Sequence, residues 1–148
     1  MRVALDTNIL AYAEGVNGTA RKNRALDLVQ KLPDGAALLP VQVLGELFSL
    51  LVRKAKRPPA KAREAILIWR DAFPVIETSA GVMLAAADLA ADHRLTIWDS
   101  VVLSAAAESG CRLLLTEDLQ EGFTWKGVTV ANPFAHPKHE LLAALLES

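Results

Sequence analysis

Four acidic residues lie beside apolar segments, at places where a carboxylate could take part in chemistry. Asp6 directly follows the apolar run VAL, and Asp118, with its neighbour Glu117, follows the run RLLLT. Asp99 lies near the start of the segment IWDSVVLSAAAESG, and Glu46 interrupts the apolar series of VQVLGELFSLLV. The chemistry open to such a set is metal binding, provided that folding brings the four together.

Each acid also has a structural explanation. Asp6 could cap a helix that follows the first strand, and Asp99 could be the acidic member of a capping box that begins at Thr96. Asp118 could be a turn residue, and Glu46 could lie at the margin of a buried helix face. Helix caps should be scattered over a domain, whereas these four acids are expected to converge on one edge of a sheet.

Convergence has an energetic consequence. Two unit charges about 4 Å apart repel by about 4 kcal/mol at an effective dielectric constant near 20, so a group of ionised carboxylates requires a cation. Hard oxygen ligands and the absence of a Cys/His cluster favour Mg²⁺ or Mn²⁺ over zinc. His136 and His139 are too few to form such a cluster, and we expect capping or loop roles for them.

The elements that must position these acids can be read from apolar runs and helical spacing. A helix is also expected directly after Asp6. Strands are expected at residues 2–6, 36–40, 75–78, 112–116 and 128–132, and further helices at 19–32, 41–56, 60–73, 80–94, 97–110 and 136–148. Alternating buried strands and helices predict a three-layer α/β/α domain with a central parallel sheet of about four to five strands. In such sheets ligands bind at the carboxyl ends of the strands, where the strand order reverses.

Composition indicates one globular domain with its own core. The chain has 148 residues, 52% of them hydrophobic, and a mean hydropathy of +0.25. It contains no apolar stretch long enough to span a membrane and no signal-peptide pattern, which predicts a cytoplasmic protein with no membrane partner. The single Cys111 is expected to be a buried structural thiol.

The net charge of −1 neither favours nor excludes a nucleic-acid partner. Two basic groups could nevertheless form a surface that faces phosphates, although such groups are also common on solvated helix faces. They comprise Arg21, Lys22 and Arg24, and then Arg53, Lys54, Lys56, Arg57, Lys61 and Arg63.

Five segments in order carry a family resemblance: LDTNILAYA, GELF, IWDSVVLSAAAESG, LLLTEDLQEG and VANPF. On these the chain resembles the PIN-domain ribonucleases, in particular the VapC-type toxins of bacterial and archaeal toxin–antitoxin pairs. The resemblance covers residues 1–134, which we interpret as a PIN-like nuclease domain. Residues 135–148 lie outside the pattern and are expected to form a helical tail that packs on the same domain or on a partner.

The resemblance implies an acidic site that binds Mg²⁺ or Mn²⁺ and cuts RNA. The matching catalytic and metal-binding positions are Asp6, Glu46, Asp99 and Asp118, and the supporting positions are Thr7, Asn8, Thr116 and Glu117, the last as a possible extra ligand. The resemblance also implies an RNA substrate (tRNA, rRNA or mRNA), a cognate antitoxin protein and a homodimer.

The expected function is therefore metal-dependent endoribonuclease activity, with basic residues of the 53–63 stretch holding the RNA backbone. One alternative is a catalytically inactive PIN-fold module that binds RNA or protein. A second is a haloacid dehalogenase-type phosphatase, which also places an Asp after its first strand. That class usually has a second carboxylate two residues further on, where this chain has Asn8.

Overall fold

A six-stranded sheet forms the centre of the protein, which a computed structural model describes over residues 1–148. The strand order is β3-β2-β1-β4-β6-β5, and all neighbours are parallel except β5, which is antiparallel to β6. The strands are β1 (Val3–Leu5), β2 (Ala37–Pro40), β3 (Val75–Ile76), β4 (Leu113–Leu115), β5 (Thr124–Trp125) and β6 (Val128–Ala131).

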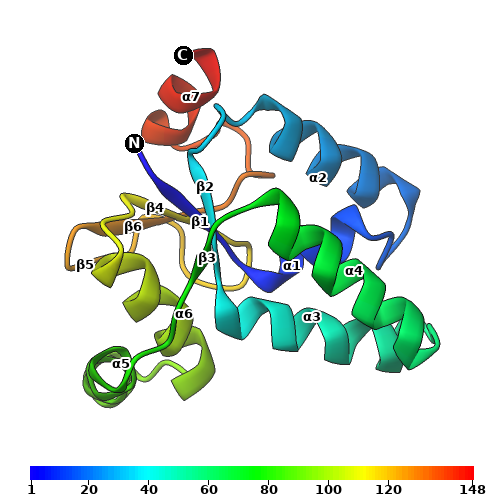
Figure 1. The fold of residues 1–148 in the computed structure, drawn as a ribbon. Coiled ribbons are helices and arrows are strands. Elements are labelled where there is room, and N and C mark those ends of the chain that lie inside the picture. The colour runs from blue at the N-terminus through cyan, green and yellow to red at the C-terminus, as the bar shows by residue number, and fades with distance from the viewer.

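Helices cover both faces of this sheet. They are α1 (Thr7–Ala13), α2 (Thr19–Lys31), α3 (Val41–Arg53), α4 (Pro59–Ala72), α5 (Ala80–His93), α6 (Ile97–Glu108) and α7 (Glu140–Glu147). Figure 1 shows α1 to α4 grouped on one side of the sheet, and α5 with α6 on the other. This division follows from right-handed crossovers, because the chain passes from β1 through β2 to β3 in one direction and then returns to β4. The predicted three-layer α/β/α architecture is confirmed.

The sheet contains one strand more than the sequence predicts. The five expected strands are present, and the additional β5 has only two residues. It forms a hairpin with β6 through Lys126 and Gly127, which both have positive φ, of 47° and 85°. Such a two-residue turn matches the twist of the flanking strands. Thr124 and Trp125 are not part of an apolar run from which this strand could be predicted, unlike Val75 and Ile76 of the equally short β3.

Local signals set the boundaries of α5 and α6, the second of which carries Asp99. Ser79 Oγ accepts a hydrogen bond from Val82 N, and Thr96 Oγ1 accepts one from Asp99 N, each at 3.1 Å, so the predicted caps of α5 and α6 are confirmed. Gly110 follows the end of α6 with φ of 74°, a conformation that Gly adopts without steric cost. These caps hold the first turn of α6, and with it Asp99, in a defined position.

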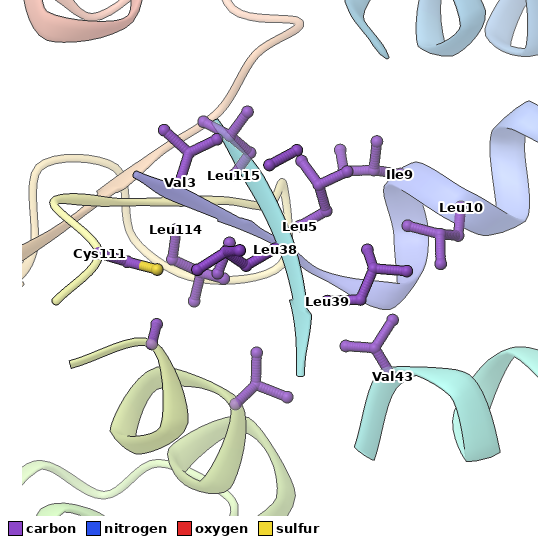
Figure 2. Packing of buried hydrophobic residues seen from close by; sticks show 14 of the residues in the cluster. Val3, Leu5, Ile9, Leu10, Leu38, Leu39, Val43, Cys111, Leu114 and Leu115 are labelled. Carbon is purple, nitrogen blue, oxygen red and sulfur yellow. The ribbon is translucent and has the colours of Figure 1, made fainter. Parts of the chain in front are cut away.

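The core is continuous from the sheet into the helix layers. Figure 2 shows Leu39 of β2 together with Leu10 of α1 and Val43 of α3, all of which are buried. Cys111 is buried as predicted, and burial raises the pKa of its thiol to about 11. Leu142 of α7 is fully buried in the same cluster, so this tail helix packs on the domain. None of the helices has both the length and the apolar character that crossing a membrane would require.

Candidate metal centre at the carboxyl edge of the sheet

The centre of the site lies between β1 and β4, where the strand order reverses. Asp6 immediately follows β1 and Thr116 immediately follows β4, and the two strands are joined there by a hydrogen bond from Asp6 N to Leu115 O of 3.0 Å. Helix α3, which carries Glu46, begins directly after the neighbouring strand β2. The reversal of strand order leaves a crevice at this edge in which ligands of open α/β sheets bind.

Asp6 is held rigidly by hydrogen bonds to both carboxylate oxygens. Oδ1 accepts from Thr7 N at 2.8 Å, and Oδ2 accepts from the Thr116 hydroxyl at 2.8 Å. The residue is only 5% exposed. Asp6 therefore does cap α1, as the structural explanation predicts, but the cap uses one oxygen and the other is directed to a residue 110 positions away.

Thr116 is the centre of a fully satisfied network. Its hydroxyl donates to Asp6 and accepts from Asn8 Nδ2 at 2.9 Å and from Asp118 N at 3.1 Å. A hydroxyl has one hydrogen and two lone pairs, so these three bonds use its full capacity. Asn8 Nδ2 also donates to Asp118 Oδ2 at 3.0 Å, which ties that carboxylate to the same network.

Glu46 and Asp99 complete the acidic group from two helices. Both are half-buried, and burial is the main cause that raises the pKa of each. The charges of Asp99 and Asp118 raise the pKa of Glu46 further, while hydrogen bonding by Gln42 opposes the rise. The cap of α6 uses the backbone amide of Asp99, so its carboxylate is not needed for capping.

Asp6 is the most strongly perturbed acid of the group. Burial raises its pKa from 3.8 to about 7, against the opposing hydrogen bonds from Thr116 and Thr7. The negative charges of Glu46 and Asp99 add to the rise. The four predicted acids thus lie close enough to affect one another electrostatically, as desolvated like charges do.

Glu117 is the predicted site residue that the structure does not bring into this group. Its carboxylate accepts a hydrogen bond from the Tyr12 hydroxyl, and its charge is not among those that raise the pKa of Asp6, Glu46 or Asp99. Its contact therefore joins α1 to the loop after β4. Tyr12 is 12 residues from the N-terminus in a run of small and apolar residues, and no spacing rule links it to Glu117.

The fit of a divalent cation can be judged from charge and donor type. Four carboxylates at this edge offer hard oxygen ligands, and one further oxygen beside them, Asn8 Oδ1, is buried without a hydrogen-bond partner. An orphaned acceptor and raised carboxylate pKa values are what a cation would relieve. No three acidic side chains are close enough, as they stand, to coordinate one ion. The residues match Mg²⁺ or Mn²⁺ in chemistry.

Two neighbours of the acidic group were not predicted as site residues. Gln42 lies one helical turn before Glu46 on α3 and lowers the pKa of its carboxylate. Trp98, next to Asp99, is 54% exposed and lies in the same groove as Glu46. The spacing of four residues between Gln42 and Glu46 is a usable signal, because side chains at i and i+4 are neighbours on a helix.

Replacing Thr116 with Val should damage the network without changing the shape of the core. Deleting the hydroxyl leaves Asp6 Oδ2, Asn8 Nδ2 and Asp118 N each without one partner, so we expect a loss of about 1–3 kcal/mol in the free energy of unfolding. Thr116→Ser retains the hydroxyl and is the matched control. Chemical denaturation of both variants measures the difference, and equal stability would show that the network contributes nothing.

Comparison with known proteins shows the family to which this chain belongs. The family model of the PIN domain matches residues 3–122. The chain belongs to the PIN domain family. The matched range contains Asp6, Glu46, Asp99 and Asp118, while α7 lies beyond it. No match was found among curated proteins.

Solved structures share the fold of this PIN domain at low sequence identity. VapC20 of Mycobacterium tuberculosis, described as a toxin that cleaves the sarcin–ricin loop, has a TM-score of 0.65 and 20% identity, over 76% of this chain and 86% of that one. A toxin–antitoxin complex from Klebsiella pneumoniae has a TM-score of 0.66 and 18% identity, over 89% and 98%. VapBC2 of Rickettsia felis, bound to a DNA fragment of its promoter, has a TM-score of 0.64 and 19% identity, over 88% and 97%.

Proposed function

We propose that this PIN domain is a metal-dependent endoribonuclease that hydrolyses RNA phosphodiester bonds, and that it is the toxin of a VapBC-type toxin–antitoxin pair. The observation that carries the proposal is the gathering of Asp6, Glu46, Asp99 and Asp118 at the reversal of strand order, with the pKa of Asp6 raised to about 7. Perturbed acids in a crevice are typical of functional sites.

Each residue of the site has a separate task in the proposed reaction. Asp6, Glu46, Asp99 and Asp118 would hold Mg²⁺ or Mn²⁺. The chemistry that such an ion supplies is the activation of a water molecule and the neutralisation of charge on the reacting phosphate. Thr116 and Asn8 keep Asp6 and Asp118 in fixed orientations, as hydrogen-bond partners of ligand side chains do in metal sites. No side chain is required as the nucleophile.

The partners follow from the family and from its structural neighbours. Structures with this fold include toxin–antitoxin complexes, and VapC20 is described as a toxin that cleaves the sarcin–ricin loop. We therefore extend three further expectations to this chain: an RNA substrate among tRNA, rRNA and mRNA, a cognate antitoxin, and a homodimer in the cytoplasm. The phosphatase alternative is not supported, because the matching family model is that of the PIN domain.

The proposal is tested by incubating the purified full-length protein with a panel of structured RNAs and mapping the new ends. We expect cleavage at discrete positions with Mg²⁺ or Mn²⁺ and none with EDTA. Cleavage that persists in EDTA would contradict the metal-dependent mechanism. RNA binding without cleavage under every metal condition would instead favour the alternative of an inactive binding module.

Two arginines of the basic stretch 53–63 have different surroundings: Arg53 lies on the surface, and Arg57 is held within the protein. Arg53 is exposed and lies seven residues, or about 10 Å, after Glu46 on the same helix face, where it could contact an RNA phosphate. Arg57 is instead bound to Glu14, with Nη1 at 2.7 Å from Oε1 and Nη2 at 2.6 Å from the carbonyl oxygen. Trp69 Nε1 donates to the same carboxylate at 2.9 Å. The sequence interpretation of the stretch as one RNA-binding group therefore does not extend to Arg57.

Alanine substitutions should separate these two roles. Arg53→Ala should weaken RNA binding and lower the slope of log affinity against log salt by about 1, with no change in stability. Arg57→Ala should lower the free energy of unfolding by about 1–3 kcal/mol, because it leaves a partly buried carboxylate without its cation. Salt titrations of RNA affinity and denaturant unfolding give the two readouts. The same result for both variants would contradict the division.

A further inference from the structure

A groove of about 510 Å³ adjoins the acidic group on the side of α3 and α6. Gly45, Glu46 and Ser49 of α3 form one wall, and Thr78 and Trp98 lie across from them. Glu46 belongs both to the groove and to the acidic group, so the groove borders the acids. A polymer whose reacting phosphate lay over the acids would therefore place a neighbouring nucleotide in or beside this groove.

Trp98 is the exposed aromatic residue of this groove. It is 54% exposed, whereas Trp69 is 6% exposed and Trp125 is partly covered by Lys126, whose Nζ lies 4.8 Å from the ring centroid. The fold gains little from Trp98, because more than half of the residue's surface stays exposed. A large aromatic side chain left exposed beside a functional site is typical of a binding surface.

Gly45 provides a second and independent observation. Gly is unfavourable inside a helix, and it is kept there when a backbone conformation or a close approach requires it. Neither condition applies within this chain, because Gly45 has no positive φ and a Cβ atom built on it would meet nothing within 4 Å. The open space at Gly45 lies on the groove wall. It is therefore available to a molecule that does not belong to the chain.

Thr78 adds an unsatisfied polar atom to the same groove. Its Oγ1 is buried and has no hydrogen-bond partner in the protein. A buried hydroxyl without a partner is uncommon and calls for a physical explanation. Because this oxygen is shielded from solvent, a hydrogen bond to a ligand in the groove requires a rotation of the Thr78 side chain.

We propose that this groove binds one unpaired nucleobase of the RNA, next to the phosphate that is cut, with the base stacked on the Trp98 ring. This inference rests on the proposed ribonuclease function and specifies how its substrate is held. Stacking needs only the flat face of a base, so binding should tolerate any of the four bases. The groove therefore selects single-stranded or extruded nucleotides over bases held in a duplex.

The first test is a series of substitutions at Trp98. The probes are fluorescein-labelled single-stranded oligoadenylate and oligouridylate, measured by fluorescence anisotropy with Ca²⁺ in place of Mg²⁺. Loss of one stacked base corresponds to about a 10-fold to 100-fold change in affinity, so we expect a weakening of that size for Trp98→Ala and Trp98→Leu. Trp98→Phe should retain most of the affinity. Trp125→Ala, which removes a tryptophan from the edge strand β5, is the matched control and should leave the RNA affinity unchanged.

The second test fills the groove from the opposite wall. Gly45→Leu should weaken RNA binding as much as Trp98→Ala does, because its side chain occupies the space that the base requires. The thermal unfolding midpoint should stay the same or rise, since the added atoms enter open space and Leu favours a helix. Gly45→Ala, which adds a single methyl group, should have the smaller effect on binding.

The third test locates the base along the substrate. In an RNA that the wild-type protein cleaves, each position near the cut is replaced in turn by an abasic ribose. The KM penalty of Trp98→Ala should disappear at one position only, where the RNA has no base to stack, while kcat changes little.

The outcomes distinguish the inference from the proposed function. Wild-type cleavage with unchanged KM and RNA affinity in Trp98→Ala would overturn the stacking subsite and leave the ribonuclease proposal intact. An equal loss in Trp98→Phe and Trp98→Ala would also overturn it. So would a Trp98→Ala protein that sediments as a monomer when the wild type is a dimer, because Trp98 would then belong to an interface between copies. A wild-type protein that neither cleaves nor binds RNA would remove both proposals.

Discussion

Replacing Asp6 with Asn is expected to lower the rate of RNA cleavage by more than about 100-fold. Substitution of groups that only support a metal ligand typically costs about 10-fold to 100-fold in metal affinity or activity, and Asp6 is proposed to be a ligand itself. It is also the acid at the centre of the site, bonded to Thr116 and affected by the charges of Glu46 and Asp99. Initial cleavage rates at saturating Mg²⁺ give the measurement.

The matched control is Asp34→Asn. Asp34 is exposed and lies in the turn before β2, at the opposite edge of the sheet from Asp6, so its loss should leave cleavage unchanged. A second measurement, the thermal unfolding midpoint, distinguishes a loss of activity from unfolding of Asp6→Asn. In EDTA near pH 8 the variant loses a buried charge but places an NH2 group where one of the donors Thr7 N and Thr116 Oγ1 had an acceptor, so we expect a cooperative unfolding transition with a midpoint close to that of the wild type. Full cleavage activity in Asp6→Asn would refute the proposed mechanism.

The second large effect is a fall in stability with rising pH in the presence of EDTA. Asp6 has a pKa of about 7 in the folded protein against 3.8 for the model group, so the folded state binds the proton more tightly. Its contribution is fully favourable below about pH 4 and is lost as the pH rises through 7. A difference of three pKa units corresponds to at most about 4 kcal/mol in the free energy of unfolding. Glu46 and Asp99, whose pKa values are also raised, act in the same direction.

Divalent cations should offset this loss where the carboxylates are ionised. A ligand that binds only the folded state stabilises it by about 2.7 kcal/mol at 100 times its dissociation constant. We therefore expect Mg²⁺ or Mn²⁺ to raise the unfolding midpoint strongly near pH 8 and little near pH 5, where protons compete for Asp6. Asp6→Asn should flatten both dependences. Two results would contradict the role assigned to Asp6. One is an unfolding midpoint in EDTA that rises between pH 4 and pH 7, and the other is a midpoint near pH 8 that does not change when Mg²⁺ is added.

These two results share one physical origin. The rigid platform that positions Asp6 is the end of a buried central strand, and the burial that makes the position well defined also disfavours the charge. Hydrogen bonds from Thr116 and Thr7 compensate part of that cost, and a cation would compensate more. The proposed site is therefore one where function and stability of the protein without metal oppose each other.

The sequence by itself determined the order and type of nearly all elements. Apolar runs predict five of the six strands, and the start and end signals at Ser79, Thr96 and Gly110 are found where they are predicted. These features depend on neighbours within a few residues of one another, so they are visible in a short window. The hairpin strand β5 was not predicted, because Thr124 and Trp125 are not part of an apolar or β-branched run, whereas the equally short β3 consists of Val75 and Ile76.

Only the tertiary structure decided which side chains share a hydrogen bond or a charge. Asp6 and Thr116 are 110 residues apart, and the sequence offers no sign that one hydroxyl would join Asp6, Asn8 and Asp118. The structure likewise directs Glu117 to Tyr12, which separates it from the acids beside which it stands in the chain. Arg57 pairs with Glu14 for the same kind of reason. Such choices depend on the direction of each side chain after the layers have packed, which residue type and spacing do not specify.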